Sequence, residues 1–285
     1  MRADSLANSL FSNDYTKFWK DISKYNNNKI GKFANVVDGC VGDKNSIERW
    51  RTHFEKLYNC NNDSVTRNTF ISQLRDSLAF ATHSGFTVQH ILKNLQKQKS
   101  GKSPGLDGIC MEALIHASPR LAVHVWLLFN LFVRHGYLPK TFMQSVIVPI
   151  IKDKTGNLSD ITNYRAIAVS TAFSNLFESV VEASLIFSSI TDKYQFGFKP
   201  GHSTGLCTGV FKNRVDYYRN RGGHVFTCFV DFSKAFDRVN YWKLFKKLLD
   251  DNVDPQIVRV LAFWYCSQEC FVRWKNCLPA GFFYE

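Results

Sequence analysis

The sequence predicts an α+β fold in which helices outnumber strands. Apolar residues recur at helical spacing on both sides of one β-branched run, "SVIVPIIKDK" at 145–154. A second run of β-forming residues, Val225–Val230, leads directly into another helical pattern. Because helices and strands do not alternate regularly, this order favours an α+β design over a parallel βαβ array.

The composition indicates a folded, basic protein. Hydrophobic residues make up 45% of the 285 residues, enough for a large core and more than one lobe. Lys and Arg total 36 against 24 Asp and Glu, which gives a formal charge of +12. This charge favours a polyanionic partner, nucleic acid first and an acidic membrane second. An ordinary basic soluble domain fits the charge alone equally well.

We expect neither a signal peptide nor a membrane span, because the first 20 residues are polar. The longest apolar stretch, Leu121–Val133, is shorter than the ~20 residues that cross a bilayer and contains two polar residues, which predicts a buried helix. The eight cysteines lack the spacing of a disulfide framework and predict a reduced, intracellular protein. No fourth ligand follows Cys266, Cys270 and Cys277 at zinc-finger spacing, so these are interpreted as free thiols.

The N-terminal part is predicted to be helical. One helix is expected around 18–22, and a stronger apolar stripe within 44–59 is interpreted as a packing face. That stripe comprises Ile47, Trp50, Phe54 and Leu57. The polar stretch 59–70 is predicted to be a linker.

The middle of the chain contains the clearest helices. Thr87 is predicted to cap one helix, which ends in the glycine-rich loop 100–109, and the stretches 119–135 and 170–187 are predicted to be buried helices. Pro149 makes 145–154 an edge strand or a bent strand. The stretch 195–205 is a turn-rich loop.

Two aspartates flank the end of the predicted strand Val225–Val230. An ionised carboxylate there, Asp231, is costly to desolvate unless it is paired or bound to a metal. Mg²⁺ takes one or two carboxylates together with substrate phosphates. From the residues alone, a turn or capping role for Asp231 stays open beside metal binding. Asp237 is predicted to be the N-cap of the following helix.

Four sequence blocks, in order, resemble the reverse transcriptases of non-LTR (LINE-type, jockey-like) retrotransposons. "GKSPGLDGI" (101–109) resembles the Lys-Ser-Pro-Gly-x-Asp-Gly block, and 146–170 resembles the fingers strand pair, although Ala166 stands where the family has proline. "QFGFKPGHST" (195–204) resembles the Gln-x-Gly-Phe block, and "FVDFSKAFDRVNYWKLFKKL" (229–248) resembles the first palm motif.

This resemblance implies the fingers and the first part of the palm of a right-hand polymerase, preceded by a helical N-terminal segment. The implied boundaries are 1–85 for the linker or N-terminal extension, 86–222 for the fingers and 223–285 for a partial palm with only the first catalytic motif.

The resemblance also implies RNA-templated DNA synthesis by phosphoryl transfer with two Mg²⁺ ions, Mn²⁺ being an alternative. Asp231 matches the carboxylate that bridges both ions, and the backbone carbonyl of Phe232 matches a further ligand. Phe236 matches the bulky residue that rejects a 2′-hydroxyl group. Lys152 and Arg165 match the basic residues that hold the incoming deoxynucleoside triphosphate.

The family's Gln-Gly block and aromatic-x-Asp-Asp hairpin do not occur in these 285 residues. The one Asp-Asp pair, Asp250-Asp251, is interpreted as a helix end. We therefore expect a chain truncated within the palm and inactive by itself. The alternatives are a non-catalytic nucleic-acid-binding remnant and a product that folds poorly.

The partners implied by the family are an RNA template, a DNA primer and deoxynucleoside triphosphates, without a membrane. The oligomeric state stays open. Such enzymes prime synthesis on chromosomal DNA, which implies access to the nucleus, with the cytoplasm as the other location.

Overall fold

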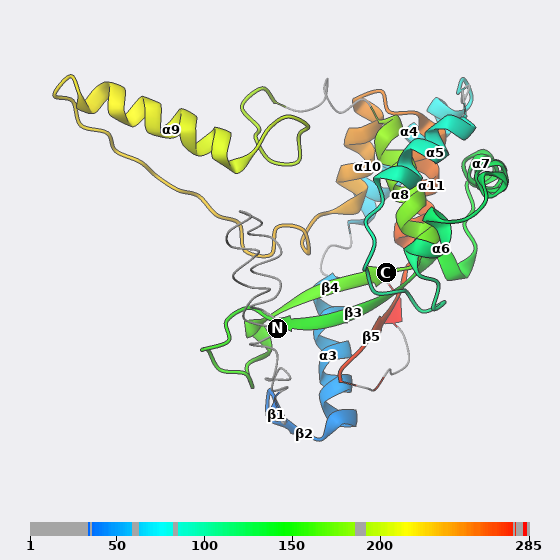
Figure 1. The fold of residues 1–285 in the computed structure, drawn as a ribbon, viewed down its shortest axis with the longest axis horizontal. Coiled ribbons are helices and arrows are strands. Elements are labelled where there is room, and N and C mark those ends of the chain that lie inside the picture. Colours follow the sequence, from blue (N-terminus) through cyan, green and yellow to red (C-terminus); the bar gives the residue numbers. More distant parts are fainter. Residues whose placement is uncertain are drawn as a thin grey trace, which may run out of the picture.

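The structure is a computed structural model that describes residues 34, 36–58, 63–81, 85–185, 192–275, 277 and 282–283. A four-stranded sheet carries helices gathered at one end, while the long helix α9 (Thr204–Arg219) lies apart from them (Figure 1). The predicted α+β class is confirmed. In the described part of the chain, no helix has the length and apolar character needed to cross a membrane. The helix expected around 18–22 lies outside the described residues.

The elements follow one another in this order. The other α-helices are α3 (Asp43–Tyr58), α4 (Ser64–Leu78), α5 (Val88–Lys97), α6 (Met111–Ile115), α7 (Pro119–His135), α8 (Ala172–Ser184), α10 (Tyr241–Asp250) and α11 (Pro255–Cys266). The strands are β1 (Val36–Val37), β2 (Cys40–Val41), β3 (Gln144–Ile151), β4 (Tyr164–Ser170), β5 (Glu269–Val272) and β6 (Phe282–Phe283). Two 3₁₀ turns, η1 (Lys140–Met143) and η2 (Ile161–Asn163), precede β3 and β4.

The main sheet has the strand order β4-β3-β5-β6, and β3 pairs antiparallel with β4 and parallel with β5. Pro149 lies in β3 and pairs with Ala166 of β4. The pairing of β5 covers only Gln144–Ile147, so within the described part of the chain β3 has one neighbour at Pro149. Proline donates no ladder hydrogen bond, and this one-sided position is where a strand tolerates it, as predicted.

Helix α3 packs its apolar stripe on this sheet. The Trp50 side chain is fully buried, with its ring centroid 4.9 Å from that of Tyr164 and 5.5 Å from that of Trp274. Ile47 and Phe54 are buried beside it. The predicted packing face is therefore confirmed, and it fixes α3 against β4 and the segment after β5.

The helices at the end of the sheet form two further apolar clusters. One joins α5, α6, α7, α8 and α11 around Phe129 and Phe177, whose ring centroids lie 4.9 Å apart. The helices predicted in this region are confirmed, and Thr87 Oγ1 caps α5 by accepting from His90 N at 3.2 Å. The other cluster joins α4, α10 and α11 around Phe70 and Phe245.

The segment between α8 and α10 departs most from the sequence prediction. Residues 223–232 contain no strand, so the predicted strand Val225–Val230 is wrong. An extended stretch instead leads from α9 back to α10 (Figure 1). It pairs with no strand among the described residues, and β-forming side chains alone do not hold a strand without a ladder partner.

Three local expectations have clear outcomes. The linker predicted at 59–70 is wrong from Ser64 onward, because α4 begins there with Asp63 as its N-cap and buries Phe70. Asp237 is not the N-cap of α10; Asn240 is, and its Oδ1 accepts from Lys243 N at 3.1 Å. The helix-end interpretation of Asp250-Asp251 is confirmed.

Candidate functional site

The β3–β4 hairpin brings Lys152 and Arg165 to the same end of the sheet. Arg165 pairs with Ile150 in the strand register, and just beyond it Lys152 N donates to Asn163 O at 2.8 Å. Lys152 Nζ donates to Thr162 O at 2.8 Å. Backbone pairing therefore sets the spacing of these two cations.

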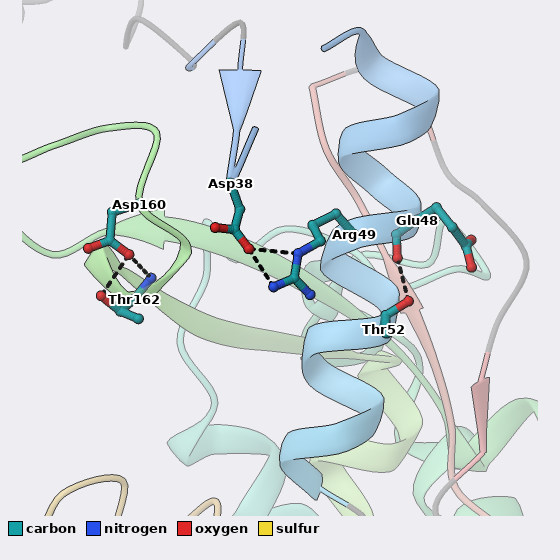
Figure 2. Close-up of polar contacts among 6 residues, drawn as sticks. All are labelled: Asp38, Glu48, Arg49, Thr52, Asp160 and Thr162. Atoms are coloured by element: carbon teal, nitrogen blue, oxygen red, sulfur yellow. Dashed lines mark hydrogen bonds and ion pairs between the residues drawn. The ribbon is translucent and has the colours of Figure 1, made fainter. Parts of the chain in front are cut away.

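The loop that joins the two strands is held by its own side chains. Asn163 Nδ2 donates to Asp153 O at 2.9 Å, and Asp153 N donates to Asn163 Oδ1 at 3.0 Å. Asp160 Oδ1 accepts from both the amide and the hydroxyl of Thr162, each at 2.8 Å (Figure 2). Short polar side chains that satisfy the backbone in this way fix a loop without external partners.

Between the hairpin, α3 and the turn 233–238 lies a pocket of about 290 Å³. Its apolar floor is formed by Phe54, Leu57, Ile161 and Tyr164. Its polar lining consists of His53, Lys152, Thr162, Arg165, Lys234 and Asp237. The floor residues Phe54, Ile161 and Tyr164 belong to the buried cluster under α3, so the pocket rests on packed core.

The charges of this pocket are mostly positive. Lys152, Arg165 and Lys234 face one carboxylate, Asp237. Among the described residues, no hydrogen bond or ion pair engages the side chains of Arg165 and Lys234. Burial raises the pKa of the Asp237 carboxyl above its usual value, while Lys234 and Lys152 act in the opposite direction. One carboxylate against three cations leaves an excess of positive charge suited to a polyanion.

His53 adds a titratable group to the same pocket. Burial, followed by the positive charges of Lys234, Arg49 and Lys152, lowers the pKa of its imidazole, and Asp38 opposes this effect. This shift favours the neutral imidazole of His53 in the free protein.

The predicted catalytic carboxylate lies outside this pocket. Asp231 is exposed on the extended segment, and its neighbour Phe232 is 77% exposed. Phe236 is also exposed, with its ring centroid 5.8 Å from that of Phe198. The first palm motif thus lies beside the Gln-x-Gly-Phe block. Asp231 does not lie at the end of a strand, because residues 223–232 form none.

No group of three or more His, Cys, Asp or Glu side chains that could hold a metal ion occurs among the residues described. A two-metal site requires more carboxylates than Asp231 supplies, because each hard divalent ion takes several oxygen ligands. The described residues alone therefore do not fit such a site.

Sequence reasoning missed three residues of the pocket. Lys234 and Asp237 stand in the block already identified around Asp231, but Lys234 had no assigned role and Asp237 was predicted to be a helix cap. His53 carries no sequence signal, because the pattern of α3 indicates packing and does not show which loop the helix lies against.

The positive charge of the pocket suits a phosphate-rich ligand. The chain is similar to several curated proteins. It is 26% identical over 271 residues to a probable RNA-directed DNA polymerase from transposon BS of Drosophila melanogaster, covering 87% of this chain and 29% of the relative. It is 31% identical over 160 residues to a probable RNA-directed DNA polymerase from the transposon X-element of the same species, covering 54% and 17%. A third relative is the RNA-directed DNA polymerase from mobile element jockey of Drosophila funebris, 25% identical over 203 residues, covering 70% and 22%.

These relatives confirm the resemblance to the RNA-directed DNA polymerases of non-LTR transposons that the four blocks predict. The chain is therefore similar to reverse-transcriptase proteins of retrotransposons. No family model matches it. The chain spans less than a third of the length of each of these relatives.

Proposed function

We propose that these residues form the fingers and the first part of the palm of an RNA-directed DNA polymerase. The observation that carries the proposal is the pocket in which Lys152 and Arg165 lie beside Lys234. Lys234 comes from the block that contains Asp231, so one pocket joins the fingers hairpin to the first palm motif. The proposed ligands are an incoming deoxynucleoside triphosphate here, and an RNA template with a DNA primer elsewhere on the protein.

Each side chain has a separate part in this proposal. The Arg165 guanidinium offers a planar fork of donors to phosphate oxygens, and the Lys152 ammonium adds a point charge whose position is fixed by Thr162. The exposed ring of Phe236 would lie under the sugar and exclude a 2′-hydroxyl group. The carbonyl of Phe232 and the carboxylate of Asp231 would be ligands for divalent metal.

Divalent metal is implied by the similarity to RNA-directed DNA polymerases, and we propose Mg²⁺, with Mn²⁺ as an alternative. Because Asp231 by itself does not fit a two-metal site, we propose that these 285 residues alone do not synthesise DNA. In the complete polymerase, priming on chromosomal DNA would require access to the nucleus.

Binding of a deoxynucleoside triphosphate tests the pocket directly. Arg165→Ala removes a charge-assisted pair of hydrogen bonds and should weaken binding roughly 10- to 100-fold, equivalent to about 1.5–3 kcal/mol. Arg75→Ala, at an exposed arginine on α4, is the matched control and should leave the affinity unchanged. Equal affinity of the Arg165→Ala variant and the wild type, measured by titration calorimetry, would remove Arg165 from the site.

A second candidate function is nucleic-acid binding without catalysis. The observation that favours it is α9, which buries no residue and exposes Lys212, Arg214 and Arg219. This function predicts RNA affinity that falls steeply with salt and does not change between Mg²⁺ and chelator. In such a filter-binding assay Asp231→Asn should bind RNA like the wild type. Weaker binding of this variant in both conditions would make Asp231 structural.

A further inference from the structure

Helix α3 places one polar side chain, His53, in the pocket, beside its own floor residues Phe54 and Leu57. The imidazole lies half-buried against Phe54, with ring centroids 5.3 Å apart. Among the described residues, no hydrogen bond occupies either ring nitrogen. Within this part of the chain, the imidazole lines the pocket without a hydrogen-bond partner of its own.

The position of His53 is fixed from two sides. On the buried face, Trp50 and Phe54 hold α3 on the sheet. On the polar face, Arg49 forms an ion pair with Asp38, whose backbone amide donates to Ser159 O at 2.7 Å in the hairpin loop. Figure 2 shows Asp38 between that loop and α3. The contacts tie α3 to the same loop that positions Lys152.

We propose that His53 binds the polyphosphate of the incoming nucleotide and takes up a proton as it does so. This inference rests on the proposed nucleotide site and adds a residue from outside the four sequence blocks. The pocket volume of about 290 Å³ is near the lower end for small-molecule sites, so the pocket suits a polyphosphate chain better than a whole nucleotide.

The proton uptake follows from the charges around His53. The charged groups that face it are Arg49 on α3, Asp38 on the β1–β2 turn, Lys152 and Arg165 on the hairpin, and Lys234 and Asp237 on the 233–238 turn. Burial first, and then the excess of cations among them, lowers the pKa of the imidazole and favours its neutral form. A polyphosphate reverses the sign of the local charge and favours imidazolium, so its pKa rises on binding.

The direction of the pH effect is fixed by this shift. The bound state holds more protons than the free state, so affinity increases as pH falls through the raised pKa of the complex. One coupled proton limits the change to about tenfold per pH unit. The terminal phosphate, with a second pKa near 6, loses charge over the same range and opposes the gain. The contribution of His53 is therefore isolated by comparing the affinities of the wild type and of a His53 variant at each pH.

The test uses His53→Gln, which keeps a hydrogen-bond donor of similar size and cannot be protonated. Inorganic tripolyphosphate and a deoxynucleoside triphosphate are titrated from pH 6 to 8.5 with chelator present, in two buffers of different ionisation enthalpy that reveal proton uptake. We expect wild type and variant to bind alike at pH 8.5 and the wild type to bind roughly tenfold tighter at pH 6. Proton uptake should occur with the wild type alone. His124→Ala, at an exposed histidine on α7, is the matched control and should behave as wild type.

The outcomes separate this inference from the proposed function. If Arg165→Ala weakens binding while His53→Gln leaves affinity and proton uptake unchanged, the nucleotide site stands and the role of His53 is overturned. If the wild type binds neither probe, both the proposed nucleotide site and the role of His53 are overturned. A short RNA oligonucleotide is the third probe. An effect of His53→Gln on RNA alone would assign the pocket to a phosphodiester backbone and overturn the nucleotide assignment.

Discussion

Two stretches rich in β-forming residues, 144–151 and 225–230, adopt different structures in this protein. The first forms β3 in the middle of the sheet, paired with β4 along its length and with β5 over part of it. The second remains extended and unpaired within the described chain, with Val230 77% exposed. The comparison teaches that strand formation here depends on a ladder partner and a face to bury more than on side-chain preference.

The same contrast separates the body of the protein from the protruding segment, defined as residues 192–232. Trp50 and Phe129 in the body are fully buried, whereas Phe226 and Phe198 in the protruding segment are 94% and 90% exposed. α9 buries no side chain. The body should therefore resist opening, and the protruding segment should open at little cost.

Limited proteolysis gives the largest expected difference between the two regions. Trypsin should cut at Lys212, Arg214 or Arg219 at least about a hundredfold faster than at Arg134 in α7, because opening the body costs ~3 kcal/mol or more. The measurement is the order of fragments identified by mass spectrometry. First cleavage within the body would contradict the contrast, as would resistance of the protruding segment.

Truncation of one aromatic ring in each region sharpens the same contrast. Trp50→Ala should lower the free energy of unfolding by about 3–5 kcal/mol, because it empties a buried site in contact with Phe54, Tyr164 and Trp274. Phe229→Ala, at a side chain 83% exposed, is the matched control and should change it by less than about 0.5 kcal/mol. Urea denaturation measures both, and equal losses would show that the protruding segment is packed in solution.

Alanine substitutions at two glycines should have the smallest effects on stability, and the two effects should have opposite signs. A Cβ at Gly105 would lie 2.8 Å from Thr171 Cα, a contact with backbone that cannot give way, so Gly105→Ala should destabilise by about 1–3 kcal/mol. A Cβ at Gly209 in α9 would meet nothing within 4 Å. Gly209→Ala should stabilise α9 by about 0.5–1 kcal/mol, seen as increased helical circular dichroism. A loss of helicity in this variant would mean that α9 has a partner in solution.

Elements with both a local signal and a buried face could be predicted from the sequence. Thr87 marks the start of α5, and the apolar spacing around Phe129 and Phe177 identifies α7 and α8. α9 was not predicted, because its start follows the turn-rich loop and it has no apolar side that packs in the structure. The strand at 225–230 was predicted wrongly for the complementary reason. Its composition is that of a strand, but no strand of the described residues pairs with it.

The residues of the candidate site also divide into those that could be predicted from the sequence and those that could not. Lys152 and Arg165 could be predicted because they stand in a block of recognisable residues, and the strand register brings them together. His53 could not, since its place in the pocket depends on how α3 lies across the sheet. That placement is decided by the packing of Trp50 on Tyr164, two residues far apart in the chain.

The pairing of early helices with late segments has a consequence during synthesis. Asp43 in α3 bonds to Lys275, 232 residues later, and Gln73 in α4 bonds to Asp250, 177 residues later. At the usual rates of translation, α4 leaves the ribosome on the order of ten to forty seconds before its partner α10 exists. During that interval Phe70 lacks Trp242 and Phe245, and Trp50 lacks Trp274 for longer still. The nascent chain is therefore a natural client for chaperones that bind exposed aromatic segments.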